Sequence, residues 1–275
     1  MSNYIHGSLP TEQERLTKLN DLINGPCLDL LALKSGERVL DVGSGLGQFT
    51  FAMAGRVGAQ GKCLGIERDK AQLKVALQNG EKANRPWVEF RQGNAENIEL
   101  QHGEWGTFDV AHARFVLEHV HQPESVLLGM AKAIRPGGKI VLADDDHAGL
   151  CLFPEPLGFS NLWQAYIRSY DRLGNDPFIG RKMVSLLYQV GLRRIRNNVV
   201  FFGDSAGTST FAGYAENLIG ILSGVKELLL KERLTSEQVF QDTMDRLTSW
   251  AQRPDAALWY TIYWAAGEKP LAAEA

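Results

Sequence analysis

The sequence predicts an α/β fold in which a doubly wound, seven-stranded, mostly parallel sheet carries helical lid insertions. Three observations support this. Short apolar runs alternate with helix-like stretches over the first 150 residues. Glycine occupies every second position of a tight turn after the first run, and the rhythm later changes to longer helical segments. Strands that alternate with helices pair in parallel, with helices packed on both faces of the sheet.

The strands are predicted from short runs rich in apolar and β-branched residues. They are expected at 38–42, 62–66, 88–91, 108–111, 139–143, near 192–202 and at 257–266. A first helix is expected over 11–33, where Leu16, Leu19 and Ile23 recur at helical spacing. Residues 135–138 (RPGG) are expected to form a turn just before the fifth strand.

We expect one domain over 1–275, built from a sheet core and a helical cap. The core is assigned to 36–150, 178–202 and 256–268, and the cap to 1–33, 151–177 and 203–255, the last with two helices. Loops after strand ends carry ligand sites in α/β proteins, so the insertions are expected to act as a lid. Trp163, Tyr166 and Tyr170 share one helical face, which is either an aromatic wall over a substrate or ordinary core.

Composition excludes several classes of protein. The 275 residues are 44% hydrophobic and 22% charged, as in ordinary globular proteins, and the net charge of −3 disfavours binding to nucleic acid through a general basic surface. Cys27, Cys63 and Cys151 show no CxxC spacing and are expected to be reduced thiols of a cytoplasmic protein. No signal peptide and no membrane partner are expected.

The turn after the first strand is the most informative segment. Gly43, Gly45 and Gly47 follow Asp41 at the strand end, and Glu67 ends the second strand twenty residues later. Glycine lets a backbone bend sharply and approach a ligand closely. A carboxylate at the Glu67 position can accept both hydroxyls of an adenosine ribose. Asp41 favours a cofactor that carries an ammonium group or hydroxyls over a bare pyrophosphate.

Residues 39–50 (VLDVGSGLGQFT) resemble motif I of the class I S-adenosylmethionine-dependent methyltransferases, with Glu67 at their acidic motif II position. Three later segments resemble further motifs in the same order. They are 93–98 (GNAENI), 108–120 (FDVAHARFVLEHV) and 128–143, which contains AIRPGGKIVL. The resemblance covers about 36–145 and the final strands. It is nearest to the small-molecule enzymes that include ubiquinone and menaquinone biosynthesis methyltransferases, and it implies a Rossmann-like fold.

The resemblance also implies a set of residues that bind S-adenosylmethionine. They are Asp41, Gly43, Ser44, Gly45, Gln48, Glu67, Arg68, Asn94, Ala95, Glu96 and Arg114. Gly43 and Gly45 would give close backbone approach, Arg68 would flank the adenine, and Glu96 would lie near its exocyclic amine.

Three further roles follow from the resemblance. Asp41 would orient the methionine ammonium, Glu67 would bind the ribose, and the Ala95 amide would donate to the adenine ring. Asn94 stands where related enzymes often carry Asp, so it contributes no charge. Arg114 either meets the methionine carboxylate or is a surface arginine at a helix start.

Methyl transfer needs a general base only when the acceptor is a hydroxyl or a carbon acid. His119, His147 and Asp145 are the candidate catalytic residues, with His112 and His121 as further near-neutral groups. The 144–147 stretch (DDDH) is a divalent-metal site, a base or substrate contact, or a solvated acidic turn. A metal site would need a matching acid after the fourth strand. Asp109 lies too early for that role and His112 is not a hard oxygen ligand, so no metal is expected.

The leading hypothesis is a methyltransferase that acts on a small molecule by in-line displacement, with S-adenosylmethionine as cofactor and S-adenosylhomocysteine as product. The alternatives are a nucleotide-cofactor oxidoreductase, which the G-x-G-x-G spacing disfavours, and a non-catalytic protein that binds S-adenosylmethionine. The acceptor, the methylated atom, and the choice between monomer and homodimer stay open. Residues 4–7 (YIHG) either fold over the cofactor or are disordered.

Overall fold

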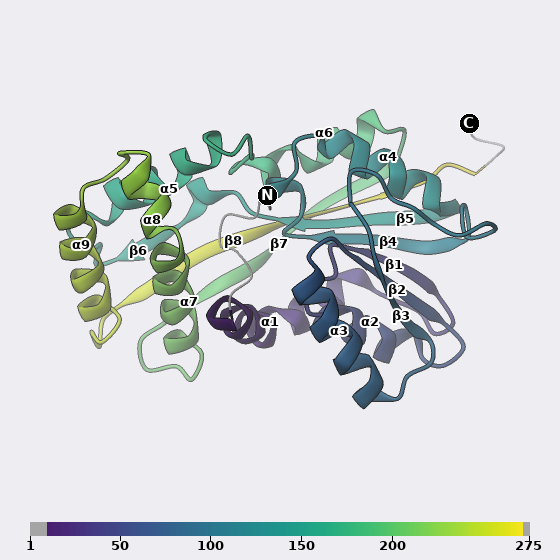
Figure 1. The fold of residues 1–275 in the computed structure, drawn as a ribbon, viewed down its shortest axis with the longest axis horizontal. Coiled ribbons are helices and arrows are strands. Elements are labelled where there is room, and N and C mark those ends of the chain that lie inside the picture. Colours follow the sequence, from purple (N-terminus) through teal and green to yellow (C-terminus); the bar gives the residue numbers. More distant parts are fainter. Residues whose placement is uncertain (1–9, 272–275) are drawn as a thin grey trace.

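Helices cover both faces of one central sheet in the computed structural model, which describes residues 10–271 (Figure 1). The strand order is β3-β2-β1-β4-β5-β8-β6, and β7 pairs with β8 as well. Strands β1 to β5 run parallel, whereas β8 is antiparallel to β5, β6 and β7. The strands are β1 (Arg38–Val42), β2 (Lys62–Glu67), β3 (Val88–Gln92), β4 (Phe108–Arg114), β5 (Ile134–Asp144), β6 (Cys151–Phe153), β7 (Arg193–Ser205) and β8 (Ala257–Glu268).

The helices divide into two layers and a cap. Helices α1, α2 and α3 lie on one face of the sheet, α4 and α6 on the other, and α5, α7, α8 and α9 gather around the far end of β7 and β8 (Figure 1). The α-helices are α1 (Pro10–Leu31), α2 (Gln48–Val57), α3 (Lys70–Ala83), α4 (Pro123–Ala133), α5 (Phe159–Asp171), α6 (Met183–Gln189), α7 (Phe211–Gly224), α8 (Lys226–Lys231) and α9 (Glu237–Trp250). Short 3₁₀ helices are η1 (Leu117–His119), η2 (His147–Gly149) and η3 (Ile179–Lys182).

The predicted fold class is confirmed, with three corrections. Within residues 10–271, the sheet has eight strands rather than seven, because Cys151–Phe153 pairs with the part of β8 that extends beyond β5. The 203–255 segment holds three helices rather than two. Residues 135–138 lie inside β5, where the register with β4 shifts, rather than in a turn before it.

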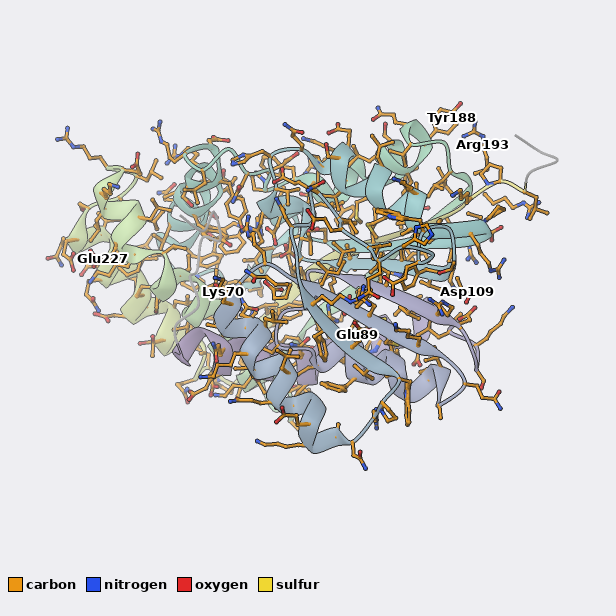
Figure 2. The ribbon with its side chains drawn as sticks, turned by 45° about the vertical axis from the view of Figure 1, so that its right-hand side comes forward. Lys70, Glu89, Asp109, Tyr188, Arg193 and Glu227 are labelled. Carbon is orange, nitrogen blue, oxygen red and sulfur yellow. The ribbon has the colours of Figure 1, made fainter. Side chains whose placement is uncertain are left out.

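The parallel strands define two opposite edges of the sheet. Lys70, where α3 begins beyond the carboxyl end of β2, and Asp109, near the amino end of β4, lie far apart in Figure 2. Asp109 accepts hydrogen bonds from the Arg38 amide and the Arg135 guanidinium. It therefore stabilises the sheet at the amino ends of the strands, away from the carboxyl edge. Ligand sites in open α/β sheets form at the carboxyl edge, which the loops after β1, β2, β4 and β5 line.

Two further expectations concern the chain as a whole. Cys27 and Cys63 are buried free thiols, and Cys151 is an exposed one. Across residues 10–271, no helix is both long enough and apolar enough to cross a bilayer. The expectation that residues 4–7 fold over the cofactor lies outside the described residues.

The central strand β1 supplies side chains to both layers. Val39 belongs to the apolar cluster beneath α1 and α2, and Leu40 belongs to the cluster beneath α4 and α6, each fully buried. We expect Leu40→Ala to lower the free energy of unfolding by about 2–5 kcal/mol, since it removes buried methyl groups and leaves a cavity. The exposed Leu77 on α3 provides a matched control, and Leu77→Ala should cost less than about 1 kcal/mol. Urea titration of both variants measures the difference, and equal losses would contradict this account of the core.

Candidate active site

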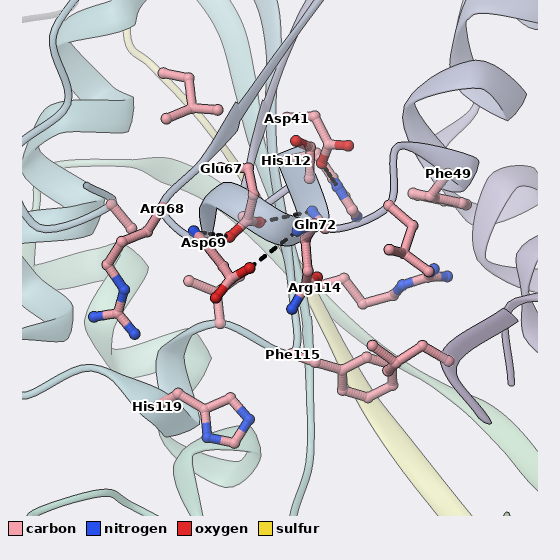
Figure 3. Close-up of a pocket in the computed structure, with 18 of the residues that line it drawn as sticks. Asp41, Phe49, Glu67, Arg68, Asp69, Gln72, His112, Arg114, Phe115 and His119 are labelled. Atoms are coloured by element: carbon pink, nitrogen blue, oxygen red, sulfur yellow. Dashed lines mark hydrogen bonds and ion pairs between the residues drawn. The ribbon is translucent and has the colours of Figure 1, made fainter. Parts of the chain in front are cut away.

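A cavity of about 200 Å³ opens at the carboxyl ends of β1, β2 and β4 (Figure 3). Its wall includes all but one of the residues predicted to bind the cofactor. Those in the wall are Asp41, Gly43, Ser44, Gly45, Gln48, Glu67, Arg68, Asn94, Ala95 and Arg114. The loop after β1, the end of β2, the loop after β3 and the end of β4 therefore converge on one ligand-sized space.

The glycines of the first loop are required by backbone conformation and by packing. Gly43 and Gly47 have φ values of 73° and 79°, which other residues rarely adopt. A Cβ on Gly43 would lie 2.4 Å from a methyl carbon of Val116, and one on Gly47 would lie 2.6 Å from the Phe90 ring. The close contacts are with neighbouring side chains, so the glycines also let the loop pack tightly beside the cavity.

Glu67 ties this loop to the end of β2. One carboxylate oxygen accepts the Gly45 amide at 2.8 Å, and the other accepts the Asp69 amide at 2.7 Å. Burial raises the pKa of Glu67, while these amides oppose the rise. Each carboxylate oxygen can accept a second hydrogen bond, so ribose hydroxyls can still be bound here.

Asp41 is more deeply embedded than the sequence suggested. One of its oxygens accepts the Thr50 hydroxyl at 2.5 Å, and the other lies 2.8 Å from His112 Nδ1. Asp41 is 3% exposed and His112 is 2% exposed, and both line the cavity. Contact with a methionine ammonium stays a prediction, and it would have to use the second lone pairs of these oxygens.

Arg114 lies at the end of β4, over the ring of Phe49, with 4.1 Å between the guanidinium carbon and the ring centre. Its Nη2 donates to the side-chain oxygens of Asn20 at 2.5 Å and Asn24 at 2.9 Å, both on α1. Its Nη1 is buried without a hydrogen-bond partner, as is the hydroxyl of Ser44. These two donors fit a cofactor with a carboxylate, because unpaired buried donors are costly.

Glu96 is the predicted cofactor residue that the structure does not bring into the cavity wall. Its carboxylate accepts the backbone amides of His121 at 3.1 Å and Gln122 at 2.9 Å, just before α4. Asn94 accepts the Glu96 amide at 3.1 Å, which shapes the turn around Ala95. Sequence reasoning missed Asn20 of α1 and Asp69, the N-cap of α3, although an Asp before a helical run is a recognisable cap.

A second chamber of about 80 Å³ adjoins the first. Leu16, Leu19, Phe115 and His119 line both, so they form a shared wall. The remaining lining is largely aromatic and aliphatic, and more than half of it comes from α5, α7 and β8. All three candidate catalytic residues, His119, Asp145 and His147, line this chamber.

Glu118 and His147 form a buried pair beside the chamber. Each is about 3% exposed, and 3.2 Å separates a Glu118 carboxylate oxygen from His147 Nε2. The Tyr170 hydroxyl donates to the same carboxylate oxygen at 2.9 Å, and the Tyr260 hydroxyl lies 3.2 Å from His147 Nδ1. Burial raises the pKa of Glu118, but His119, His147 and Tyr170 outweigh burial and lower it to about 2. Burial lowers the pKa of His147, but Glu118, Asp145 and Asp146 together outweigh burial and raise it.

Tyr166 and Tyr170 are therefore part of a polar network as well as of the core. Their hydroxyls lie 2.8 Å apart, and the indole nitrogen of Trp163 donates to the His147 carbonyl at 2.7 Å. The two interpretations of this aromatic face were a substrate wall and core packing. Core packing is confirmed, since the three side chains are at most 6% exposed. They also line the chamber, so a role as a substrate wall stays a prediction.

Asp145 differs from its partners. Its Oδ1 atom is buried without a hydrogen-bond partner. Burial raises the pKa of Asp145 to about 7, the Glu118 charge adds to the rise, and His147, Tyr260 and Arg15 oppose it. A carboxyl group with a pKa near neutrality can give and take a proton at neutral pH.

The premise that no acid follows the fourth strand was wrong. Glu118 lies four residues beyond β4, and its carboxylate comes within 4.8 Å of ligand atoms on Asp145 and His147. Sequence reasoning missed Glu118 because it precedes the more conspicuous His119. The spacing alone would also admit a cation, but His147 and Tyr170 already occupy the Glu118 oxygen that faces them.

Backbone contacts fix the loops that carry these groups. Buried Asp144 accepts the amides of Val116 and Leu117 at 3.2 and 2.8 Å, which joins the loop after β4 to the end of β5. The Gly180 amide donates to the Asp145 carbonyl at 2.9 Å. A Cβ on Gly180 would lie 2.8 Å from that carbonyl oxygen, so η3 packs directly on Asp145.

Asp145 should make stability depend on pH. A group whose pKa is higher in the folded than in the unfolded protein stabilises the fold below the unfolded value, and this is lost as the pH rises through the folded value. With an unfolded pKa of about 3.9 and a folded pKa of about 7, Asp145 stabilises the protein less and less between these limits. We expect the free energy of unfolding of the wild type, minus that of Asp145→Asn, to fall by up to about 1.4 kcal/mol per pH unit there.

Urea titrations at several pH values measure this difference. Asp171→Asn, an exposed Asp at the end of α5, is the matched control and should follow the wild type. A flat difference between wild type and Asp145→Asn would show that Asp145 titrates normally.

Comparisons with known proteins agree with this geometry. Residues 33–156 match a family model described as "Methyltransferase domain". A demethylmenaquinone methyltransferase of Bacillus cereus (strain AH187) is 28% identical over 190 residues, which cover 64% of this chain and 78% of the relative. An uncharacterised 37.1 kDa protein in transposon TN4556 of Streptomyces fradiae is 29% identical over 164 residues, which cover 60% of this chain and 46% of that protein.

Solved structures share the fold. A Haemonchus contortus phosphoethanolamine N-methyltransferase 2, solved with phosphomonomethylethanolamine and S-adenosylhomocysteine, superposes with a TM-score of 0.56 at 19% identity. The match covers 90% of this chain and 52% of that one. The matched domain, the strand order and the ten residues gathered around the first cavity lead to one conclusion. Residues 33–156 form a methyltransferase domain, and the chain shares the fold of solved methyltransferases.

Proposed function

We propose that this protein is a class I S-adenosylmethionine-dependent methyltransferase, and that it acts on a small, largely apolar acceptor that binds in the second chamber. The observation that carries the proposal is the wall shared by the two cavities, Leu16, Leu19, Phe115 and His119. In-line displacement requires acceptor and methyl donor to lie side by side without water between them. Two adjoining cavities meet that requirement when one holds the cofactor and the other the acceptor.

The chemical character of the second chamber supports an apolar acceptor. Trp163 and Phe202 contribute aromatic surface, and Leu218 and Ile262 contribute aliphatic surface, while the polar groups gather around Glu118. Ligand sites of this kind gain affinity from apolar contact and orientation from a few polar groups. The near balance of charges over the whole chain also favours a small molecule over nucleic acid.

In the first cavity, residues of this chain would hold and orient the cofactor. We assign the ribose hydroxyls to Glu67, the adenine edge to Ala95, and the methionine carboxylate to Arg114 with the Ser44 hydroxyl. Arg114 has a buried, unpaired donor for that role. Bound there, the cofactor supplies an electrophilic methyl group, and the chain's part is alignment and exclusion of water.

Three further assignments belong to the proposal. We assign the sheet segments 36–150, 178–202 and 256–268 to cofactor binding, and the cap segments 1–33, 151–177 and 203–255 to acceptor binding, within one domain. We place the enzyme in the cytoplasm, in keeping with its free thiols. Monomer and homodimer both fit the proposal.

Calorimetric titration tests the cofactor side. S-adenosylmethionine and S-adenosylhomocysteine should bind, and NADH, the ligand of the oxidoreductase alternative, should not. Glu67→Ala removes a carboxylate that anchors the loop and the ribose, so we expect binding to weaken by about 10- to 100-fold. Glu81→Ala, at an exposed position on α3, is the matched control and should bind like the wild type. NADH binding alone would refute the assignment.

A chamber-filling variant tests the acceptor side. Ile221 of α7 lines the second chamber and lies outside the wall of the first. We expect Ile221→Trp to abolish methyl transfer to acceptors found by screening, with unchanged affinity for S-adenosylhomocysteine, because the indole would occupy the acceptor volume. Leu157→Trp, at a 75% exposed position, controls for added aromatic bulk. Full activity of Ile221→Trp would place the acceptor elsewhere, and binding of the cofactor without any methyl transfer by the wild type would favour the non-catalytic alternative.

A further inference from the structure

The acidic groups beside the second chamber are not equivalent. One oxygen of Glu118 faces both His147 and Tyr170, and the other lies 3.4 Å from His119 Nε2. Both ring nitrogens of His147 have partners as well. Of Glu118, Asp145 and His147, only Asp145 keeps a buried oxygen with no hydrogen-bond partner. A new proton donor entering the chamber can therefore pair with Asp145 Oδ1 without displacing an existing contact.

The hydrogen bonds of the cluster also fix where the protons lie. Glu118 is a carboxylate and accepts from Tyr170, so the neighbouring Tyr166 hydroxyl donates to Tyr170. His147 then donates through Nε2, which lies 3.2 Å from Glu118 Oε2 and 3.0 Å from the Tyr170 oxygen, and through Nδ1 to the Tyr260 oxygen, as an imidazolium paired with a carboxylate. The proton of Tyr260 is left to point toward Asp145, with which Tyr260 interacts.

This arrangement sets the charge that an acceptor meets. Glu118 and His147 cancel each other, and the Asp145 carboxylate faces the Arg15 cation from α1, which also lines the chamber. A cationic amine would add an uncompensated positive charge to an apolar volume, which is costly. A neutral hydroxyl adds no charge and offers a proton to Asp145 Oδ1.

Building on the function proposed above, we infer that Asp145 is the general base and that the acceptor is an apolar molecule with a phenolic or enolic hydroxyl. In the reaction, the hydroxyl proton moves to Asp145 Oδ1. The electron pair that it leaves forms the new bond to the methyl carbon, at oxygen or at the conjugated carbon. The carbon–sulfur bond breaks with its electron pair on sulfur, and S-adenosylhomocysteine is released. After methylation at carbon, loss of the carbon-bound proton to solvent restores the ring.

The surroundings of Asp145 suit this role. The titratable groups that interact with it are Asp144 on β5, Glu118 on η1, His147 on η2, Tyr260 on β8, Arg15 on α1, and the Tyr166 and Tyr170 hydroxyls on α5. Burial and Glu118 bring its pKa to about 7, against the opposing effects of His147, Tyr260 and Arg15. A base works best when its pKa lies near the working pH.

Binding of 4-ethylphenol to the protein loaded with S-adenosylhomocysteine tests the inference. The hydroxyl of this probe, like that of tyrosine, titrates near pH ~10 and stays protonated between pH ~5.5 and ~8.5. We expect about tenfold tighter binding at the upper pH, because a charged carboxylate accepts a stronger hydrogen bond than a neutral carboxyl. The O-methylated probe 4-ethylanisole should bind with no pH dependence.

Variants separate a proton-accepting role from a structural one. Asp145→Asn should remove the pH dependence, and Asp171→Asn should keep it. Tyr260→Phe should move the midpoint to higher pH, since Tyr260 lowers the pKa of Asp145. A purely structural role would leave the midpoint unchanged.

The outcomes are distinguishable. Failure of S-adenosylhomocysteine to bind would overturn the proposed function itself. If it binds, but 4-ethylphenol binds equally at all pH values or binds Asp145→Asn with the same pH profile, the inference about Asp145 is wrong. Methyl transfer that requires added Mg²⁺ and is abolished by EDTA would also overturn the inference. The cluster of Glu118, Asp145 and His147 would then be assigned to a cation.

Discussion

The pairing of two buried charges, Glu118 and His147, governs the structure beside the second chamber. Strands β4 and β5 are neighbours and end at the same edge of the sheet, so Glu118 and His147 enter one apolar volume. A buried carboxylate that loses its partner costs several kcal/mol, and the two groups must therefore stay together. The backbone around them is correspondingly fixed, with Asp144 binding the loop after β4 and the Pro177 carbonyl accepting the His147 amide. Asp145 lies between Asp144 and His147 in the sequence, so these contacts also fix its position.

Helix α1 couples the two cavities. Leu16 and Leu19 contribute to the wall of each, so the helix is the partition as well as the cover. Its polar residues reach in both directions, because Asn20 binds Gln48 and Arg114 on the cofactor side and Arg15 binds Asn217 of α7 at 2.6 Å. The position of the helix thus depends on groups at both sites, and a cofactor that occupies the Arg114 side also helps to shape the acceptor wall.

The residues around the first cavity could be predicted from the sequence because they follow one another in a fixed order of short elements along the chain. A strand, a glycine turn, a helix and an acid at fixed spacing place Gly43 and Glu67 together in any doubly wound sheet. Glu96 was predicted to contact the cofactor but does not line the cavity, since its side chain accepts backbone amides just before α4. The acceptor side depends on contacts over long separations, such as 113 residues between His147 and Tyr260. No spacing rule predicts that those residues meet. The role of Glu118 could not be predicted either, because its partners His147 and Tyr170 are distant in the sequence.

The same division explains why a methyltransferase domain leaves the acceptor undefined. Contacts to the cofactor arise from strand ends and loops that the fold holds in place, whereas the acceptor wall is drawn largely from α1, α5 and α7. Within the chamber, the charge balance restricts the acceptor more than the apolar lining does. Apolar surface accepts many shapes, but a single unpaired carboxylate oxygen beside an already neutral ion pair accepts one kind of partner, a neutral proton donor.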